Sequence, residues 1–320
     1  MNVHKFYTPS GKVTFHGLLL MPAFGFLGTV MGSYLYFLFK AHLCTIVLLF
    51  PLVLGGIAGG GVALGVHWGK IRNTVIAGIL GAAAGLLAFG MTFYWGYLDL
   101  QNYVQSYALE EWEEILSDDE ALTLTDQIIG DETGHTGLYG YAFFSIDSSR
   151  FSLFRIGRSS FDAYEFGETT PSWINRIIAS VELLAAVLAA WLMAHSEANS
   201  RFCEKDHRWF KSKTVLTNSP ESAENLTKAI LADDYNLALS YVSPPADPKQ
   251  AMDIKVDHCP TCRDGVMEIG VGTGMKHKAV YSQKINEQQF SELEKLGEKA
   301  KEMLKNAAEK PREEMEKAKE

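Results

Sequence analysis

The stretch TVIAGILGAAAGLLAFGMTFYWGYL, residues 74–98, decides the fold class of this chain. It contains no Asp, Glu, Lys or Arg. As an α-helix it would be about 37 Å long at 1.5 Å per residue, which exceeds the roughly 30 Å hydrocarbon core of a bilayer. We therefore expect residues 74–98 to form a transmembrane helix.

Three further stretches are also long and apolar enough to cross a bilayer. They are Gly17–Phe39, Leu43–Val66 and Ile174–Met193. The first is longer than the apolar region of a cleavable signal peptide, so we expect it to be retained. The sequence predicts an α-helical integral membrane protein with four transmembrane helices, which contact the lipid bilayer.

Lysine and arginine in the flanks predict the orientation, because these residues resist translocation. A cytoplasmic N-terminus places nine of them inside: Lys5, Lys12, Lys70, Arg72, Arg201, Lys205, Arg208, Lys211 and Lys213. The opposite side then holds fewer: Lys40, Arg150, Arg155, Arg158 and Arg176. We expect both termini in the cytoplasm.

The segment between the third and fourth helices is strongly acidic. Residues 99–173 contain 15 Asp or Glu, three Arg and no Lys. Tyr107–Leu116 has a helical amphipathic pattern, residues 130–140 are rich in turn formers, and Tyr141–Ile146 and Phe151–Ile156 are strand-like. We expect a small α+β extracytoplasmic segment.

The chain after the fourth helix is polar and contains three of the four cysteines. Ser219–Ser240 has a helical pattern, and residues 284–320 have mixed charge with apolar residues at helical spacing. The predicted domains are an N-terminal tail with three helices (1–98), the acidic segment (99–173), the fourth helix (174–195), a cytoplasmic module (196–283) and a charged helical tail (284–320).

Two ligand pairs in the cytoplasmic module point to a metal. Cys203 and His207 form one pair, and Cys259 and Cys262 form the other. Together they supply the four N and S ligands that a structural, tetrahedral zinc site uses. Cys259-Pro-Thr-Cys262, followed by the strand-like Val266–Ile269, is typical of a zinc-ribbon knuckle, so we expect a zinc-ribbon-like α+β module.

The first pair departs from the knuckle pattern, because Asp206 stands where a second cysteine is typical. His207 is therefore the expected fourth ligand. Two alternatives remain: a ribbon fold that has lost its metal, or a redox pair made of Cys259 and Cys262. We do not expect a catalytic metal, since no open position or general base is evident.

The transmembrane stretches are rich in glycines four residues apart, which allow helix backbones to approach closely. The pairs are Gly28/Gly32, Gly55/Gly59, Gly56/Gly60, Gly61/Gly65 and Gly81/Gly85. Packing within one chain is the simpler interpretation, and a homo-oligomeric interface or pore is the alternative. Glu182 is the carboxylate well inside an apolar stretch, which makes it the candidate functional residue within the membrane.

Three short motifs resemble an uncharacterised group of bacterial membrane proteins. They are Pro9-Ser-Gly-Lys12, Gly69-Lys-Ile-Arg-Asn73, and Phe202-Cys-Glu204 with Trp209. The resemblance covers the chain to about Gly270 and implies a four-helix membrane unit joined to a cytoplasmic ribbon-like module. It implies a bacterial plasma membrane and no particular activity.

The preferred functional hypothesis is a non-enzymatic scaffold or regulator that recruits a protein partner through its cytoplasmic module. The alternatives are a small homo-oligomeric channel or transporter and, third, a membrane-bound redox or lipid-modifying enzyme that cycles Cys259 and Cys262. Nucleic-acid binding is not expected, because residues 214–283 contain no dense basic stripe.

Overall fold

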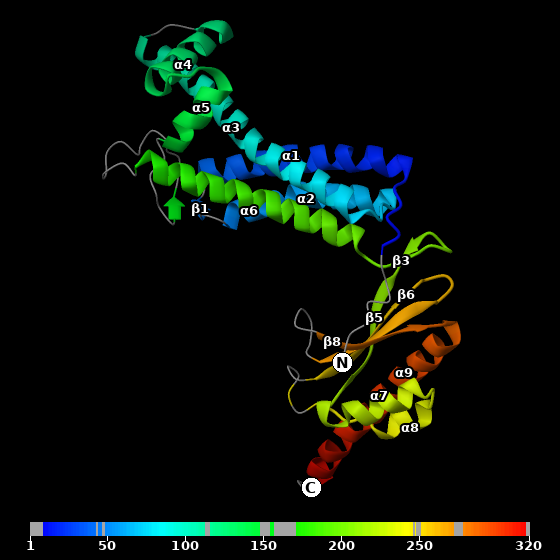
Figure 1. Ribbon diagram of the computed structural model, residues 1–320. Coiled ribbons are helices and arrows are strands. Elements are labelled where there is room, and N and C mark those ends of the chain that lie inside the picture. Colours follow the sequence, from blue (N-terminus) through cyan, green and yellow to red (C-terminus); the bar gives the residue numbers. More distant parts are fainter. Residues whose placement is uncertain are drawn as a thin grey trace. The chain divides into compact units, whose positions relative to one another are not determined.

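A computed structural model describes residues 9–42, 44–46, 49–112, 116–147, 154–156, 171–245, 247, 251–271 and 278–317. The chain forms two compact units, which divide between Asn199 and Ser200. We call residues 9–199 the membrane unit and residues 200–317 the C-terminal unit, and we describe each by itself (Figure 1).

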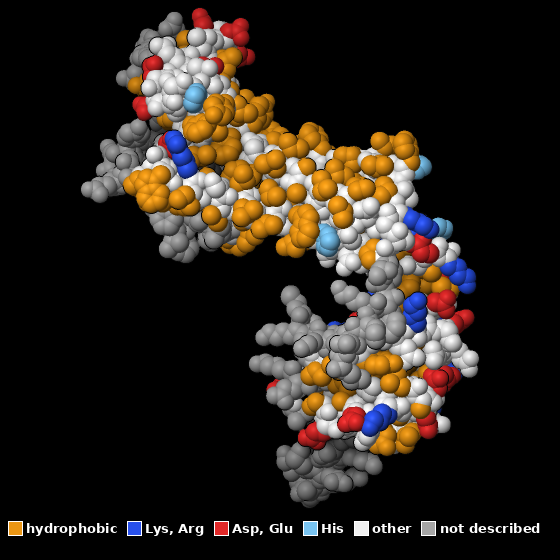
Figure 2. All heavy atoms as spheres, in the orientation of Figure 1, with side chains coloured by type: hydrophobic (Ala, Val, Ile, Leu, Met, Phe, Trp, Pro, Cys, Tyr) orange, Lys and Arg blue, Asp and Glu red, His pale blue; other side chains and the backbone are white. Residues whose placement is uncertain are grey.

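Four helices of the membrane unit are long and apolar enough to cross a bilayer. They are α1 (Phe15–His42), α2 (Leu49–Gly69), α3 (Thr74–Trp112) and α6 (Ser172–Ala198). They pack side by side (Figure 1). Figure 2 shows large apolar side chains covering the visible surface of these helices, as a lipid-facing surface requires. The four apolar helices expected from the sequence are confirmed.

Glycines on α2 bring neighbouring helices into backbone contact. A Cβ atom added at Gly59 would lie 2.5 Å from the Cα of Ala190 on α6, and one added at Gly65 would lie 2.5 Å from the Cα of Met21 on α1. Gly55 and Gly61 meet the same two helices. These glycines therefore pack helices within one chain, whereas Gly56 and Gly60 face open space.

The second helix begins later than predicted. Residues Cys44–Ile46 form a short strand, β1, and α2 begins at Leu49. β1 pairs antiparallel with β2 (Phe154–Ile156), so Thr45 lies opposite Arg155. Apolar content alone assigned these residues to a helix, but β-branched residues such as Thr45 and Ile46 also favour a strand when a partner is present.

The acidic segment is helical over most of its described residues. α3 continues to Trp112, and α4 (Asp118–Thr133) and α5 (Gly137–Asp147) follow. Ser117 and Glu120 form a capping box that begins α4. The predicted strand at Tyr141–Ile146 is wrong, because these residues belong to α5. Within the predicted strand Phe151–Ile156, residues 154–156 are the strand β2 and residues 151–153 lie outside the described residues.

A small apolar core holds this helical cap onto the end of α3. Tyr97, Leu100 and Val104 of α3 pack with Ile129 of α4, and Tyr141 joins them from α5. The Tyr97 hydroxyl donates to the Asp126 carboxylate at 2.7 Å. Tyr141 and the nearby Phe144 are three residues apart, so a helix presents both toward this core, which a strand could not do.

The C-terminal unit contains a four-stranded antiparallel sheet in the order β5-β6-β7-β8. Its strands are β5 (Lys211–Asn218), β6 (Met252–His258), β7 (Gly265–Val271) and β8 (Lys278–Ile285). A separate hairpin pairs β3 (Phe202–Cys203) with β4 (Arg208–Trp209). The helices are a 3₁₀ turn (Pro220–Ser222), α7 (Ala223–Leu231), α8 (Tyr235–Ser240) and α9 (Glu287–Lys317).

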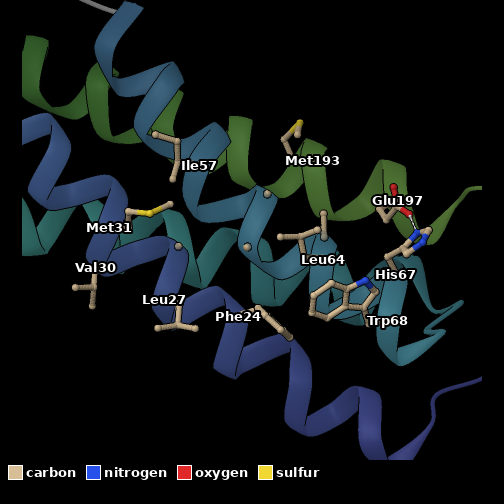
Figure 3. Close-up of a pocket in the computed structure, with 14 residues that line it drawn as sticks. Phe24, Leu27, Val30, Met31, Ile57, Leu64, His67, Trp68, Met193 and Glu197 are labelled. Atoms are coloured by element: carbon tan, nitrogen blue, oxygen red, sulfur yellow. Dashed lines mark hydrogen bonds and ion pairs between the residues drawn. The ribbon is translucent and has the colours of Figure 1, made fainter.

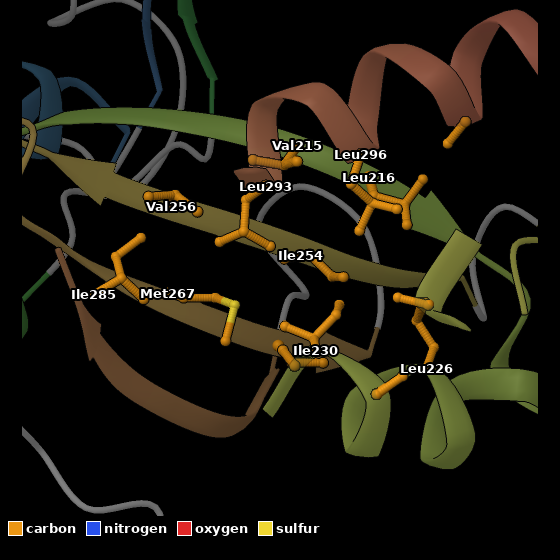
Figure 4. Packing of buried hydrophobic residues seen from close by; sticks show 14 of the residues in the cluster. Val215, Leu216, Leu226, Ile230, Ile254, Val256, Met267, Ile285, Leu293 and Leu296 are labelled. Atoms are coloured by element: carbon orange, nitrogen blue, oxygen red, sulfur yellow. The ribbon is translucent and has the colours of Figure 1, made fainter. Parts of the chain in front are cut away.

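The core of this unit lies between the sheet and the helices (Figure 4). A bulge in β5 between Thr214 and Leu216 lets the consecutive Val215 and Leu216 both face the core. The predicted helices at Ser219–Ser240 and in the charged tail are confirmed. Phe290 and Leu293 of α9 are buried in the same core, so the first half of the tail packs against its own sheet.

Candidate metal centre

The β3-β4 hairpin presents the first two donor groups. Cys203 ends β3, and Asp206 lies in the turn that leads to Arg208. The Phe210 amide donates to the Arg201 carbonyl at 2.9 Å, which closes the base of the hairpin. Phe202 and Trp209 pack edge to face across it, with ring centroids 5.0 Å apart. The hairpin is therefore a short turn that fixes Cys203 relative to Asp206.

The β6-β7 turn presents the other two donors. Cys259 follows β6, and its amide donates to the Asp264 carbonyl at 2.9 Å just before β7. The Arg263 amide donates to the Cys259 carbonyl at 3.1 Å. These bonds fold Cys259-Pro-Thr-Cys262 into a tight turn.

The two turns share one local design. Each has donors at positions i and i+3, namely Cys203 with Asp206 and Cys259 with Cys262. The residue after each second donor has a left-handed backbone, with φ of 52° at His207 and 59° at Arg263. The same backbone form thus turns both donors of each pair toward one point.

The four donor atoms lie within 4.8 Å of one another, so the cluster can hold a metal ion. Cys203 Sγ is 3.7 Å from Cys262 Sγ, and Asp206 Oδ2 is 3.1 Å from Cys259 Sγ. Cys203 and Cys259 are buried, whereas Asp206 and Cys262 are half-buried. His207, the ligand expected from the sequence, is exposed and lies outside this cluster, and Asp206 stands in its place.

The spacing fits a tetrahedral zinc ion. Zn–S bonds of about 2.3 Å place two sulfurs of a regular tetrahedron about 3.8 Å apart. The observed sulfur–sulfur distance of 3.7 Å between Cys203 and Cys262 matches that edge and is far longer than a disulfide bond. All three cysteines of the cluster are free thiols. The four donors are therefore close enough together to hold a metal ion.

The electrostatics of the metal-free cluster favour protonated thiols beside an ionised carboxylate. Burial raises the pKa of Cys262 to about 12 and also raises the pKa of Cys259. Hydrogen bonds from Cys262 and Cys259 lower the pKa of Asp206. A metal ion would reverse this arrangement, because it binds thiolates and displaces their protons.

Arg201 fastens the hairpin to the sheet beside the cluster. Its guanidinium forms ion pairs with Asp257 of β6 and Glu268 of β7. All three side chains are largely shielded from solvent, and the two carboxylates come from the strands on either side of the Cys259 turn. Arg201 therefore positions the two ligand-bearing turns against each other.

Glu182, the other sequence-predicted candidate, lies in α6 of the membrane unit and is half-buried. It therefore belongs to a different unit from the cysteines. Of its expected polar neighbours, Ser33 accepts a hydrogen bond from Trp95 Nε1 at 3.0 Å, and Thr92 donates to the Phe89 carbonyl.

Comparisons with known proteins found no matching family model, no matching curated protein and no matching solved structure. The capacity for metal binding therefore follows from the donor atoms of this chain alone, and membership of a bacterial family stays a prediction.

Proposed function

We propose that this chain is a non-enzymatic membrane protein whose C-terminal unit, held together by a structural zinc ion, recruits a protein partner to the membrane. The observation that carries the proposal is the convergence of Cys203, Asp206, Cys259 and Cys262. Four protein donors fill a tetrahedral shell and leave no position for a substrate, which is the arrangement of structural rather than catalytic zinc.

The zinc-ribbon-like character of the unit is part of this proposal. Two equivalent turns hold the ligands, and the ion would join the β3-β4 hairpin to the β6-β7 turn. Without the ion, that hairpin is a two-residue ladder held to the sheet by Arg201 and the cluster's own hydrogen bonds. Zinc would therefore fix the surface around the hairpin in one conformation.

Helix α9 supplies a surface for the partner. Among the residues of α9 whose side chains the structure describes, which end at Asn306, Ala300 is the last in the buried core, and the helix itself continues to Lys317. Met303, in the first turn beyond the core, is 39% exposed. An amphipathic helix that projects past its own core is a common element of helix-in-groove recognition.

The positive-inside rule places this unit in the cytoplasm, and the resemblance noted above favours a bacterial plasma membrane. Reporter fusions at residues 2 and 320 would test the orientation. Reporter activity typical of the periplasm at either end would contradict it.

The two alternative functions have less support. Gly55 and Gly59 of α2 contact the backbone of α6 in the same chain, so these glycines are not available to line a pore. A redox pair would need a lowered thiol pKa, whereas the pKa values of Cys259 and Cys262 are raised.

The test combines metal content with partner recruitment in the full-length protein. Mass spectrometry of the purified chain should find one zinc per chain, and Cys259→Ser should lose it. Proximity labelling from the C-terminus in the native membrane should mark partners that disappear in Cys259→Ser and in a chain ending at residue 305. A folded wild-type chain without metal, or identical labelling in all three proteins, would reject the proposal.

A further inference from the structure

A groove runs along the outer surface of the membrane unit between α1, α2 and α6 (Figure 3). Its volume is about 1040 Å³, at the upper end of the range typical of ligand pockets. Apolar side chains such as Leu27, Met31 and Leu64 line most of it. Gly60 also lines it. A Cβ atom added at Gly60 would meet nothing within 4 Å, so the groove is open over this glycine.

The groove is polar at one end only. There, His67 of α2 and Glu197 of α6 form an ion pair, with His67 Nδ1 and Glu197 Oε1 2.7 Å apart. Both side chains remain partly exposed. Trp68 lies beside them and packs edge to face on Phe24, as is typical of a tryptophan at a membrane interface. The groove therefore runs along the helices from an apolar end at Ile57 and Met31 to a polar end at His67 and Glu197.

The length of the groove matches a single leaflet. Its lining on α2 runs from Ile57 to Trp68, about 16 Å of helix at 1.5 Å per residue. Half of a hydrocarbon core of about 30 Å is close to that length. A lipid acyl chain therefore fits the groove over the depth of one leaflet.

We propose that this groove is a binding site for one phospholipid with a zwitterionic, amine-bearing headgroup, such as phosphatidylethanolamine. Its acyl chains would lie over Gly60 along the apolar lining. At the polar end, the headgroup ammonium would donate to Glu197 and the phosphate would accept from His67. The carboxylate at this end is complementary to the ammonium of such a headgroup, and the imidazole beside it offers an N–H to the phosphate.

The experiment compares two glycine variants of the full-length chain. Gly60 lines the groove, whereas Gly56 lies one turn earlier on α2 and is not part of the lining. Added Cβ atoms meet nothing within 4 Å at either position, so both leucine variants should fold equally well. Gly60→Leu fills the groove, and Gly56→Leu is the matched control.

Each protein is stripped of lipid, reconstituted with phosphatidylethanolamine and examined by native mass spectrometry. The wild type and Gly56→Leu should each retain one lipid per chain, and Gly60→Leu should bind about tenfold more weakly or worse, because an apolar contact of leucine size is lost. Glu197→Gln should remove the preference for phosphatidylethanolamine over phosphatidylglycerol.

Equal lipid retention by the wild type and Gly60→Leu would overturn the proposal. It would equally be overturned by a lipid-free dimer that Gly60→Leu dissociates, since the occupant would then be a second copy of the chain. Glu197→Gln with an unchanged headgroup preference would refute the role given to the charged end.

Discussion

Asp206 is the residue that most sharply tests the candidate metal centre, because the donor expected from the sequence was His207 and the cluster in the structure contains Asp206 instead. The structure places its carboxylate among the three thiols and leaves His207 outside. We expect Asp206→Ala to weaken zinc binding at least 100-fold, since loss of a ligand costs more than the 10- to 100-fold typical of an outer-shell partner. His207→Asn, which keeps a residue type tolerant of the left-handed backbone, should leave the affinity unchanged.

The effect on thermal unfolding follows from linkage. Zinc at 100 times its Kd adds about 2.7 kcal/mol to the free energy of unfolding, and at a concentration equal to Kd it adds only about 0.4 kcal/mol. A fragment of residues 200–320, which contains the C-terminal unit, has an entropy of unfolding of about 0.25 kcal/mol/K at that length. Zinc should therefore raise Tm by about 11 °C in the wild type and by about 2 °C in Asp206→Ala.

The assay is calorimetry of the C-terminal unit with buffered zinc and with a chelator. The difference between the two scans cancels the stability that Asp206 lends the metal-free fold through its hydrogen bond from the Cys262 amide. Equal zinc-dependent shifts in wild type and Asp206→Ala would refute the assigned ligand set. A shift lost in His207→Asn and kept in Asp206→Ala would restore the sequence-based assignment.

Four further outcomes follow from the structure. Zinc would bind the cysteines as thiolates and displace at least the protons of Cys259 and Cys262, whose pKa values are raised, so its affinity should fall by about 100-fold or more from pH 7 to pH 6 in a chelator competition assay. The metal-free unit should instead lose stability above about pH 8.5, where thiols ionise in the unfolded chain but stay protonated in the folded one, and flat melting temperatures there would contradict the burial argument. Gly59→Leu should lower the stability of the membrane unit by about 3 kcal/mol or more, because its side chain meets the α6 backbone, while Gly60→Leu should have little effect in the same detergent unfolding assay. Glu182→Gln should leave ion permeability of proteoliposomes unchanged, and a flux in the wild type that this variant abolishes would favour a channel over a recruitment protein.

Sequence patterns predicted the helices that apolar length determines. The stretch 74–98 contains no charged residue, and an α-helix satisfies all of its backbone hydrogen bonds within the segment itself. Sequence patterns were less informative where strand pairing or side-chain packing determines the secondary structure. Thr45 and Ile46 join a strand because β2 lies beside them, and Tyr141 belongs to a helix because Tyr97 offers it a packing surface.

The candidate metal ligands show the same limit of sequence patterns. The cysteines were predictable from their chemistry, but the choice between Asp206 and His207 depends on backbone direction. The i, i+3 spacing of Cys259 and Cys262 was the available signal, because applying it to Cys203 selects Asp206. The groove between α1, α2 and α6 had no such signal, since it depends on which of several equivalent glycine pairs remains uncovered.

Helix α3 joins the apolar bundle to the cap without a break. It runs from Thr74 to Trp112 with no proline, about 58 Å at 1.5 Å per residue, and the cap is packed on its distal turns. A sideways force on the cap would therefore tilt the N-terminal part of α3, which packs against α6. One uninterrupted helix therefore joins the acidic cap to the apolar bundle, so that binding at the cap and packing of the bundle act on the same element.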